Sequence, residues 1–486
     1  MAQPRGMVSY GAMDRREFLR NAAFGACAAG SPAWLAAESA AQKPTQQIDL
    51  TIDSFQRLGP IPVDFMGLGY EISSIATPGL LSASNRVYAG LVRRLGKRGV
   101  IRIGGNTSDY SSFAERATAV SAPKATKINE AGLRDLAEFL DATGWSLIWG
   151  LNLGNGSMND AVAEARAVAH AVGDRLLAFE IGNEPDLYVH EGHRPRYSYE
   201  QYLAEYRRYK SAVRAALPHV GFAGPDAAGA TGWVERFVAD EGHDLRLLTH
   251  HYYREGQNPT RTADKLLHPD AKLAAMLDRM RAASKSSGVP YRICETNSFS
   301  GGGRPGVSDT FAAALWALDY LCVLAWHGAD GVNMETGINQ LDFISSYSPI
   351  GDDRRGHYRA APEFYGMLAF AEGCRGERIA VSYDAGTVNL TAYATVDADG
   401  TSTVIVNKDE GTDANIRIAV KSKAGSARVL RLAAPSLDSR TGVTLGGAAV
   451  EQDGQWHGRS EVARVIHGIC RVHVPAASAA IVKLES

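Results

Sequence analysis

The stretch Leu176-Leu177-Ala178-Phe179-Glu180-Ile181-Gly182-Asn183-Glu184 has the pattern of a short buried β-strand that ends in a carboxylate. A second run, Tyr291-Arg292-Ile293-Cys294-Glu295, ends in the same way. In a closed barrel of eight parallel strands, each followed by a helix, the C-terminal ends of all strands meet at one mouth. The two runs therefore predict a (β/α)8 barrel with two carboxylates that face each other at its mouth.

The chain contains the number of strand-like segments that such a barrel requires. The eight predicted strands are 65–71, 100–106, 146–154, 176–184, 220–226, 245–253, 291–297 and 331–337. Amphipathic stretches with helical periodicity lie between them. A doubly wound open sheet is the competing topology, but no Gly-rich dinucleotide loop follows any of these strands. We therefore predict an α/β fold, with a TIM barrel over residues 57–373.

After residue 373 the pattern changes to short alternating runs, separated by turns rich in Gly, Asp and Asn. No helical pattern intervenes, which is typical of an antiparallel β-sandwich of ordinary domain size. The segment 47–55 alternates in the same way, and it precedes the first barrel strand. We therefore predict a β-sandwich domain that is built from both ends of the chain, residues 45–56 plus 374–486.

The N-terminal segment has the pattern of an export signal. Arg15 and Arg16 precede Phe18-Leu19, and a weakly apolar, alanine-rich stretch follows. This arrangement is typical of a bacterial twin-arginine signal. Residues 1–41 are therefore predicted to be a twin-arginine export signal and the mature protein to be periplasmic or secreted; the alternative is a basic helix start of the folded domain. No later segment reaches the roughly 20 apolar residues needed to span a bilayer, so no membrane is expected as a partner after signal removal.

Composition excludes several classes of partner and cofactor. The formal net charge of −2 over 486 residues provides no long-range field for nucleic acid or anionic membranes. Five cysteines do not make a disulfide framework in a chain of this size, although a bond between Cys374 and Cys470 is left open. His250 and His251 adjoin on a strand, so their side chains point to opposite faces and cannot bind one ion. No metal or other cofactor is predicted, and the oligomeric state stays open.

Two facing carboxylates suit the hydrolysis of a glycosidic bond. One protonates the leaving oxygen, and the other, ionised, attacks the anomeric carbon. Glu184 suits the first role, with the amide of Asn183 beside it to bind a sugar hydroxyl. Glu295 suits the second role. Each glutamate alone has a structural explanation, at a helix start or a strand end, but the pair on strands four and seven favours catalysis.

Other strand ends supply candidate substrate-binding groups. Tyr252, near the end of strand six, is expected to hydrogen-bond the nucleophile. Arg102 on strand two is expected to pair with Glu295 and keep it ionised. Glu71 ends strand one and Asn106 ends strand two, and both are assigned to the binding of sugar hydroxyls.

Three motifs carry a resemblance to a known family. Residues 101–109 (IRIGGNTSD), 250–253 (HHYY) and 295–303 (ETNSFSGGG) resemble glycoside hydrolase family 79, which contains bacterial β-glucuronidases and heparanases. The resemblance spans residues 45 to 486. It implies that Glu184 is the acid/base and Glu295 the nucleophile of a retaining enzyme, with Tyr252 beside the nucleophile. It also implies that the backbone amides of Gly301 and Gly302 receive the carboxylate of a uronic acid, so that the substrate is a β-glucuronide.

Strand eight departs from the family pattern. It contains Glu335, where relatives that bind glucuronate tend to have a histidine or another group compatible with a carboxylate. Glu335 shares a face with Asn333, and both are predicted to point to the mouth and bind substrate. A charged Glu335 would repel a sugar carboxylate by about 4 kcal/mol at ~4 Å and an effective dielectric near 20.

Three functions therefore stay open. An exo-β-glucuronidase requires that Glu335 is protonated or turned away, in which case Arg354, Arg355, His357 or Tyr358 is a candidate to bind the carboxylate. A β-glycosidase for a neutral sugar is the first alternative. A non-catalytic carbohydrate-binding barrel is the second, and the presence of both acids argues against it.

Overall fold

A computed structural model describes residues 43–113, 125–229, 231–256, 261–338, 344–419 and 425–485. The predicted export signal, residues 1–41, lies outside these ranges. Within them, none of the helices is both long and apolar enough to cross a membrane.

Eight parallel strands form one sheet in the order β7-β6-β3-β2-β11-β10-β9-β8. A parallel bridge between Phe179 and Phe222 joins its two ends, so the sheet closes into a barrel. The strands overlap the eight predicted runs, and the predicted barrel is confirmed. They are β2(Gly67–Glu71), β3(Val100–Gly104), β6(Ser146–Leu151), β7(Leu176–Ile181), β8(Ala223–Ala227), β9(Leu247–Glu255), β10(Tyr291–Phe299) and β11(Gly331–Glu335).

At least one α-helix follows each barrel strand along the chain. The helices are α1(Arg86–Leu95), α2(Glu130–Thr143), α3(Met158–Val172), α4(Tyr199–Ala216), α5(Thr231–Glu241), α6(Ala263–Leu267), α7(Ala271–Ser287), α8(Phe311–Trp326) and α9(Pro362–Gly373). Polar side chains begin several of them: Asn129 caps α2, and Ser198 and Gln201 form a reciprocal capping box at α4. Helix α2 ends at Gly144, whose φ of 80° lies in the left-handed region that glycine adopts without strain.

Shorter elements lie in the barrel loops. They are the 3-10 helices η1(Ile72–Ala76), η2(Ser108–Tyr110), η3(Gly173–Arg175), η4(Pro185–Leu187) and η5(Gly242–Asp244), and the strand pairs β4(Ser111–Phe113) with β5(Thr126–Ile128) and β12(Ile350–Asp352) with β13(Tyr358–Ala360).

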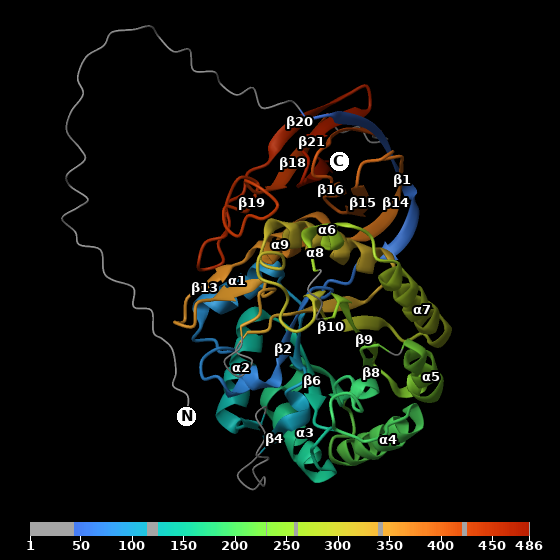
Figure 1. Cartoon of the computed structure of the whole chain (residues 1–486), viewed down its shortest axis with the longest axis vertical. Coiled ribbons are helices and arrows are strands. Elements are labelled where there is room, and N and C mark those ends of the chain that lie inside the picture. The colour runs from blue at the N-terminus through green and yellow to red at the C-terminus, as the bar shows by residue number, and fades with distance from the viewer. Residues whose placement is uncertain are drawn as a thin grey trace, which may run out of the picture. The chain divides into compact units, whose positions relative to one another are not determined.

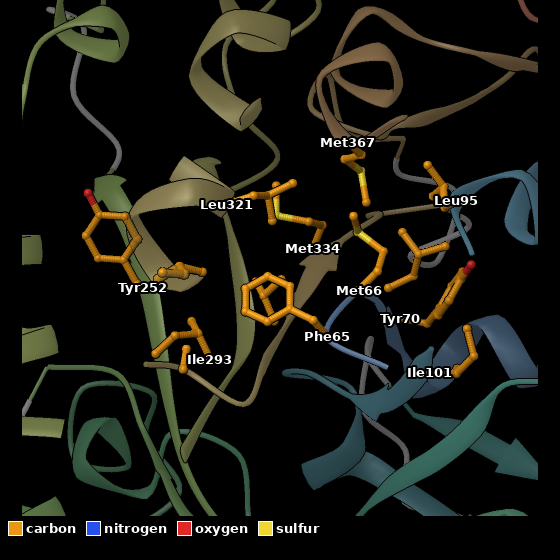
Figure 2. Packing of buried hydrophobic residues seen from close by; sticks show 14 of the residues in the cluster. Phe65, Met66, Tyr70, Leu95, Ile101, Tyr252, Ile293, Leu321, Met334 and Met367 are labelled. Carbon is orange, nitrogen blue, oxygen red and sulfur yellow. The ribbon is translucent and has the colours of Figure 1, made fainter. Parts of the chain in front are cut away.

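The barrel strands are buried on both faces. Every residue of β2, β3 and β11 is buried, which is the pattern of a parallel sheet covered by helices outside and filled by side chains inside. Figure 2 shows part of this core, where Phe65, Met66 and Met334 lie close together. A packed interior leaves the strand ends at the mouth as the place where polar side chains from different strands meet.

Ten strands form a second sheet, in the order β19-β18-β20-β21-β17-β1-β14-β15-β16-β22, and a further pairing of β18 with β22 closes it. The second, all-β part of the predicted fold class is thereby confirmed. The strands are β1(Thr45–Pro60), β14(Glu377–Tyr383), β15(Leu390–Asp397), β16(Gly400–Asn407), β17(Asp413–Ala419), β18(Ser426–Ala433), β19(Thr444–Leu445), β20(Glu461–Ile466), β21(Ile469–Val474) and β22(Ser478–Glu485).

Strand β1 precedes the barrel in the sequence but belongs to this sheet, whose other strands all follow the barrel. It pairs antiparallel with β14, beside which it runs in Figure 1, and parallel with β17. The alternation of Ile48, Leu50 and Ile52 that marked this segment in the sequence places all three side chains in the core of the sheet.

The disulfide left open by the sequence is absent. Cys374 and Cys470 are both free, as are the other cysteines of the described residues. The thiol of Cys374 lies 3.6 Å from that of Cys322 on α8, whereas Cys470 packs in the core of the ten-stranded sheet. The two cysteines therefore face different cores.

Candidate active site

The two predicted carboxylates lie at the mouth of the barrel. Glu184 directly follows the fourth barrel strand, β7, and Glu295 lies in the seventh, β10. Both side chains are largely buried and line one cavity of about 600 Å³, which we call the catalytic cavity. One carboxylate oxygen of each lies within 4.8 Å of the other. The fold thus brings together two groups that are far apart in the sequence.

Both oxygens of Glu295 accept hydrogen bonds from buried groups. Arg102 donates from Nη1 to Oε2 over 2.9 Å, and the hydroxyl of Tyr253 donates to Oε1 over 2.9 Å. The ion pair with Arg102 is the one that the sequence suggested. A buried guanidinium and a phenol together stabilise the negative charge of Glu295 and hold its orientation.

Arg102 links four acceptors below the mouth. Besides Glu295, its guanidinium donates to Glu180 (2.9 Å), Asn183 (2.9 Å) and Asp226. Burial alone would raise the pKa of Asp226, but the charges of Arg102 and His251 hold it below its usual range. Neither Glu180 nor Asp226 was predicted from the sequence, although a charged residue inside a buried apolar strand was an available signal.

Glu184 has a different environment from Glu295. His251 contacts Glu184 Oε1 through Nδ1 (2.9 Å) and Asp226 Oδ1 through Nε2 (2.8 Å). Burial raises the pKa of Glu184 to about 7; the hydrogen bond from His251 lowers it, and the charge of Glu295 raises it. Glu184 therefore holds a proton near neutral pH, as a general acid requires, while Glu295 is paired with a cation.

His251 is charged in this arrangement. Burial alone would lower its pKa, but the carboxylates of Asp226 and Glu295 and its hydrogen bonds raise the pKa well above the usual value. The imidazolium then donates one N–H to Asp226 and the other to Glu184. Its contact with Glu184 places a proton donor beside that carboxyl group, a role that was not predicted from the sequence.

Tyr252 lines the catalytic cavity, but its hydroxyl does not contact Glu295, so the predicted hydrogen bond to this carboxylate is wrong. Its hydroxyl donates to Asp270 over 2.8 Å, and its ring stacks on Tyr320 with centroids 5.5 Å apart. Figure 2 shows Tyr252 among the buried hydrophobic residues of the core. The next residue, Tyr253, bonds to Glu295 instead. Because side chains alternate along a strand, His251 and Tyr253 share the inward face of β9, and Tyr252 faces the other way.

Replacing Tyr253 with phenylalanine should lower kcat/KM by roughly 10- to 100-fold, since a hydrogen bond to a charged group contributes about 1.5–3 kcal/mol. Tyr252→Phe is the matched control and should change kcat/KM by less than about 3-fold, because its hydroxyl bonds to Asp270. Steady-state kinetics of the two variants measure the difference. Equal losses in both would contradict the assignment of Tyr253 to the nucleophile.

Glu71 and Asn106 line the catalytic cavity, as assigned. Glu71 accepts hydrogen bonds from the backbone N–H of Asn106 (3.1 Å) and from both N–H and hydroxyl of Thr107 (2.7 and 2.6 Å). Burial and then the charge of Glu295 raise its pKa to about 7. The side-chain oxygen Oδ1 of Asn183 accepts a hydrogen bond from Arg102, and its Nδ2 donates to the side-chain oxygen Oδ1 of Asn106 over 3.2 Å. Asn183 therefore supports the site through Asn106.

Glu335 also lines the catalytic cavity and is not turned away. Its Oε1 accepts a hydrogen bond from the Gly337 N–H (3.2 Å), and its Oε2 has no partner among the described residues. Burial, and then the charges of Glu295 and Glu71, raise the pKa of Glu335 well above its usual value. In its protonated form Glu335 adds no negative charge to the cavity wall.

Asn333 does not reach the mouth, so its assignment to substrate binding is wrong. It accepts a hydrogen bond from Arg292 (2.6 Å) and donates to the carbonyls of Leu68 and Val100 (3.1 and 2.9 Å). It shares the inward face of β11 with Glu335, but it lies two residues, about 6.6 Å, further from the strand end. This depth places it in the packed interior of the barrel.

The predicted alternative carboxylate binders lie elsewhere. Arg354, Arg355 and His357 are exposed between β12 and β13, and Tyr358 packs against the ring of Tyr88. None of them is among the residues that line the catalytic cavity, and among its described lining residues there is no lysine or arginine.

Gly301 and Gly302 line the catalytic cavity. Their φ values of 67° and 84° lie in the left-handed region, which glycine adopts without strain. Neither backbone N–H has a hydrogen-bond partner among the described residues, while the carbonyl of Gly302 is held by the backbone N–H and hydroxyl of Ser346 (2.7 and 2.8 Å). Successive free N–H groups form a concavity that suits an anion.

Glu184, His251 and Glu295 also offer one ligand atom each within 4.8 Å of one another, a spacing that a metal ion can accept. However, both ring nitrogens of His251 are bonded to carboxylates, and Arg102 already pairs with Glu295. The donor set is therefore engaged as an ion-pair network rather than open for a metal.

Sequence comparisons relate the chain to proteins of known activity. The family profile described as "Glycosyl hydrolase family 79 C-terminal beta domain" matches residues 388–481. The chain is 26% identical over 422 residues to a β-glucuronidase of Aspergillus niger, covering 75% of this chain and 77% of the relative. It is 27% identical over 203 residues to heparanase of Rattus norvegicus, covering 40% of this chain and 36% of that protein.

The structural comparison concerns the fold. The structure of a 4-O-α-L-rhamnosyl-β-D-glucuronidase from Fusarium oxysporum 12S superposes with a TM-score of 0.74 at 19% sequence identity, covering 90% of this chain and 100% of that one. An arabinofuranosidase superposes with a TM-score of 0.67 at 14% identity. Both enzymes share the architecture found here.

Proposed function

Because the chain belongs to glycoside hydrolase family 79, we propose that it is an exported, retaining exo-β-glucuronidase. That the protein is a glycoside hydrolase follows from its relatives, and the finer assignment is our proposal. The observation that carries it is the carboxylate pair of Glu184 and Glu295, with oxygens within 4.8 Å. Retaining enzymes place their carboxyl groups about 5–5.5 Å apart, whereas inverting enzymes leave about 6.5–9.5 Å for a water molecule.

The proposed reaction has two displacements. The Glu295 carboxylate attacks the anomeric carbon, and the glycosidic C–O bond breaks as Glu184 transfers its proton to the leaving oxygen. Glu184, now ionised, then takes a proton from water, and the resulting hydroxide oxygen displaces Glu295 from the anomeric carbon. Two inversions return the sugar with its original configuration, and both glutamates regain their starting states.

The free N–H groups of Gly301 and Gly302 support a uronic acid in the glycone position. Without a lysine or arginine in the described lining, they are the groups best suited to bind a carboxylate there. The raised pKa of Glu335 favours its protonated form, which does not repel that carboxylate. The similarity to curated β-glucuronidases favours the same substrate.

A neutral glycone is the second candidate function. Five glutamates line the catalytic cavity, and Glu335 occupies a position where its ionised form would repel a uronate by about 4 kcal/mol at ~4 Å. The direct measurement is the hydrolysis of matched aryl β-glucuronide and aryl β-glucoside by the mature protein, with NMR of the first-formed anomer. Preference for the glucuronide with a β-product supports the proposal, and preference for the glucoside contradicts it.

Replacing Glu335 with glutamine should change kcat/KM for an aryl β-glucuronide by less than about 3-fold near pH 6, because glutamine mimics a protonated glutamate. If Glu335 were ionised, removing its charge would instead raise kcat/KM by up to roughly 10³-fold, the equivalent of about 4 kcal/mol. Steady-state kinetics distinguish the two. Glu191→Gln, which alters another acid of the same cavity, is the matched control.

Export is tested separately from catalysis. Replacing Arg15 and Arg16 with lysine in the full chain should keep the protein in the cytoplasm of a bacterial host with twin-arginine export, because the arginine pair is the recognised feature of such signals. Fractionation with activity assays measures this. Unchanged export of the double variant would contradict the proposed signal.

A further inference from the structure

Two free thiols lie next to each other, away from the catalytic cavity. Cys322 belongs to α8 and Cys374 directly follows α9, and their Sγ atoms are 3.6 Å apart. The other described cysteines, Cys294 and Cys470, pack in two separate apolar clusters, and neither has a thiol neighbour among the described residues. The pair on α8 and α9 takes no part in the proposed glycosidase chemistry.

The two helices that carry the thiols run side by side in the same direction. A Cβ atom at Gly366 on α9 would lie 2.1 Å from the carbonyl oxygen of Ala314 on α8, so the backbones touch there. The thiols meet at the same offset further along both helices, since 314 to 322 and 366 to 374 are equal steps. A disulfide requires an S–S distance of about 2.05 Å. Side-chain rotation, rather than a movement of either helix, has to supply the remaining approach.

The two thiols differ in their access to solvent. Cys374 is 5% exposed and lines a cavity of about 380 Å³, which it forms with the end of α1 and the segment between β1 and β2; we call it the thiol cavity. Cys322 is 0% exposed, and burial raises the pKa of its thiol well above the usual value. Because exchange with an external disulfide needs access and a thiolate, Cys374 is the thiol that reacts first.

The thiol cavity has a positively charged wall. Arg94, Lys97, Arg98 and Arg375 line it, and no Asp or Glu is among its described lining residues. A wall of this charge attracts anionic reagents. Oxidised glutathione, a disulfide that carries carboxylates, is therefore a suitable probe of Cys374.

Both helices also contact the ten-stranded sheet. On α8, Asp319 accepts hydrogen bonds from the hydroxyls of Thr391 and Tyr393 on β15 (2.6 and 2.8 Å). On α9, a Cβ atom at Gly373 would lie 2.6 Å from the side chain of Val404 on β16. A bond between the two thiols would therefore join α8 to α9 where both helices pack against this sheet.

We propose that Cys322 and Cys374 form a dithiol site that reacts with a disulfide compound to give an intramolecular disulfide. The Cys374 thiolate attacks one sulfur of the external disulfide, its S–S bond breaks, and the departing thiolate takes up the proton of Cys374. The thiol of Cys322 then attacks the sulfur of Cys374 and passes its proton to the second departing thiolate. The external disulfide gains two electrons and becomes two thiols, and the protein loses two hydrogen atoms. This inference goes beyond the proposed function and does not depend on it.

The bond would stabilise one wall of the catalytic cavity. It closes a loop whose ends are 52 residues apart and which carries Glu335 and Tyr347. A cross-link of this kind restricts the unfolded chain and so stabilises the folded one. The oxidised protein should melt roughly 3–8 °C above the reduced protein. In an oxidising compartment the cross-linked form would be the resting state.

The test uses the full chain with Cys27→Ala, which removes the cysteine outside the described residues and leaves four. The folded, reduced protein is incubated with oxidised glutathione, then unfolded and alkylated with iodoacetamide. Mass spectrometry should show two alkylated thiols in place of four, and peptide mapping should place the bond between Cys322 and Cys374. Cys470→Ala is the matched control, because it removes a buried thiol of another cluster, and the same bond should form in it.

Single variants distinguish the two thiols. In Cys322→Ala, glutathione should stay attached to Cys374, because no second thiol displaces it. Cys374→Ala should take up at least about 10-fold less glutathione, because Cys322 is buried. Neither variant should show the rise in melting temperature on oxidation.

Three results would overturn the proposal. They are four alkylated thiols in the treated parent chain, a bond that involves Cys294 or Cys470, and a lasting glutathione adduct on Cys374 while Cys322 is present. The assay requires neither a substrate nor export. Failure of the proposed glycosidase function therefore leaves its result unchanged, and the two failures are distinguishable.

Discussion

Replacing Glu295 with glutamine should lower kcat by on the order of 10⁴-fold or more, the scale seen when a hydrolase loses its nucleophile. The amide cannot form the covalent glycosyl-enzyme, and no other described carboxylate is held by both Arg102 and Tyr253. The fold should persist, since glutamine has the same shape and its oxygen still accepts a hydrogen bond. Kinetics with an aryl β-glucuronide, alongside the thermal melting curve, measure both expectations.

Chemical rescue identifies the role of Glu295 more sharply than loss of activity does. With Glu295→Ala, added azide should attack the anomeric carbon from the vacated face and release an α-glycosyl azide, because only one inversion takes place. The control Glu191→Gln, which alters another of the five glutamates that line the catalytic cavity, should keep its activity within a few-fold. Activity of Glu295→Gln comparable to that of the natural protein would refute the assignment.

The second large effect is expected at Glu184. Glu184→Gln should lower kcat/KM by roughly 10²- to 10⁴-fold for a substrate whose leaving group needs protonation, the range of general acid catalysis. A dinitrophenyl leaving group, which departs without a proton, should be much less affected. With Glu184→Ala, azide should produce a β-glycosyl azide, since it attacks the intermediate on Glu295 and completes the second inversion. Equal losses for both leaving groups would contradict a general-acid role.

The same residue determines the alkaline limb of the pH profile. Burial raises the pKa of Glu184 to about 7, so the protonated, active form predominates below that pH and is lost as pH rises through it. The natural protein should therefore lose kcat/KM above about pH 7, and Glu184→Gln should lose this limb. A limb that persists unchanged in the variant would assign it to another group.

The pattern of the sequence predicted the barrel because each strand is a local feature. The eight apolar runs, the helical periodicity between them and the alternation at 47–55 are visible without tertiary contacts. Glu184 and Glu295 were identifiable because strand ends of a closed parallel barrel share one mouth, whatever the details of packing. The ion pair between Arg102 and Glu295 was predictable for the same reason.

For the remaining site residues, the role depends on which face of the strand the side chain occupies and on how far it lies from the strand end. Tyr252 was expected to hydrogen-bond Glu295 and Asn333 to bind substrate, but the Tyr252 hydroxyl bonds to Asp270 and Asn333 lies two residues too deep. His251 was considered only as a metal ligand, whereas it links Asp226 to Glu184. A motif shows which residues are present near a strand end, but a shift of one residue along a strand reverses the face of every side chain.

By itself, the sequence determined the strand count, the closed barrel class and the two carboxylates at its mouth, because these follow from short-range periodicity and topology. Only the tertiary structure decided which tyrosine bonds to Glu295, and that Glu335 lines the catalytic cavity with a raised pKa. Those properties depend on burial and on charges contributed by distant strands. These contributions of burial and charge act on a side chain only after folding has brought the distant strands together.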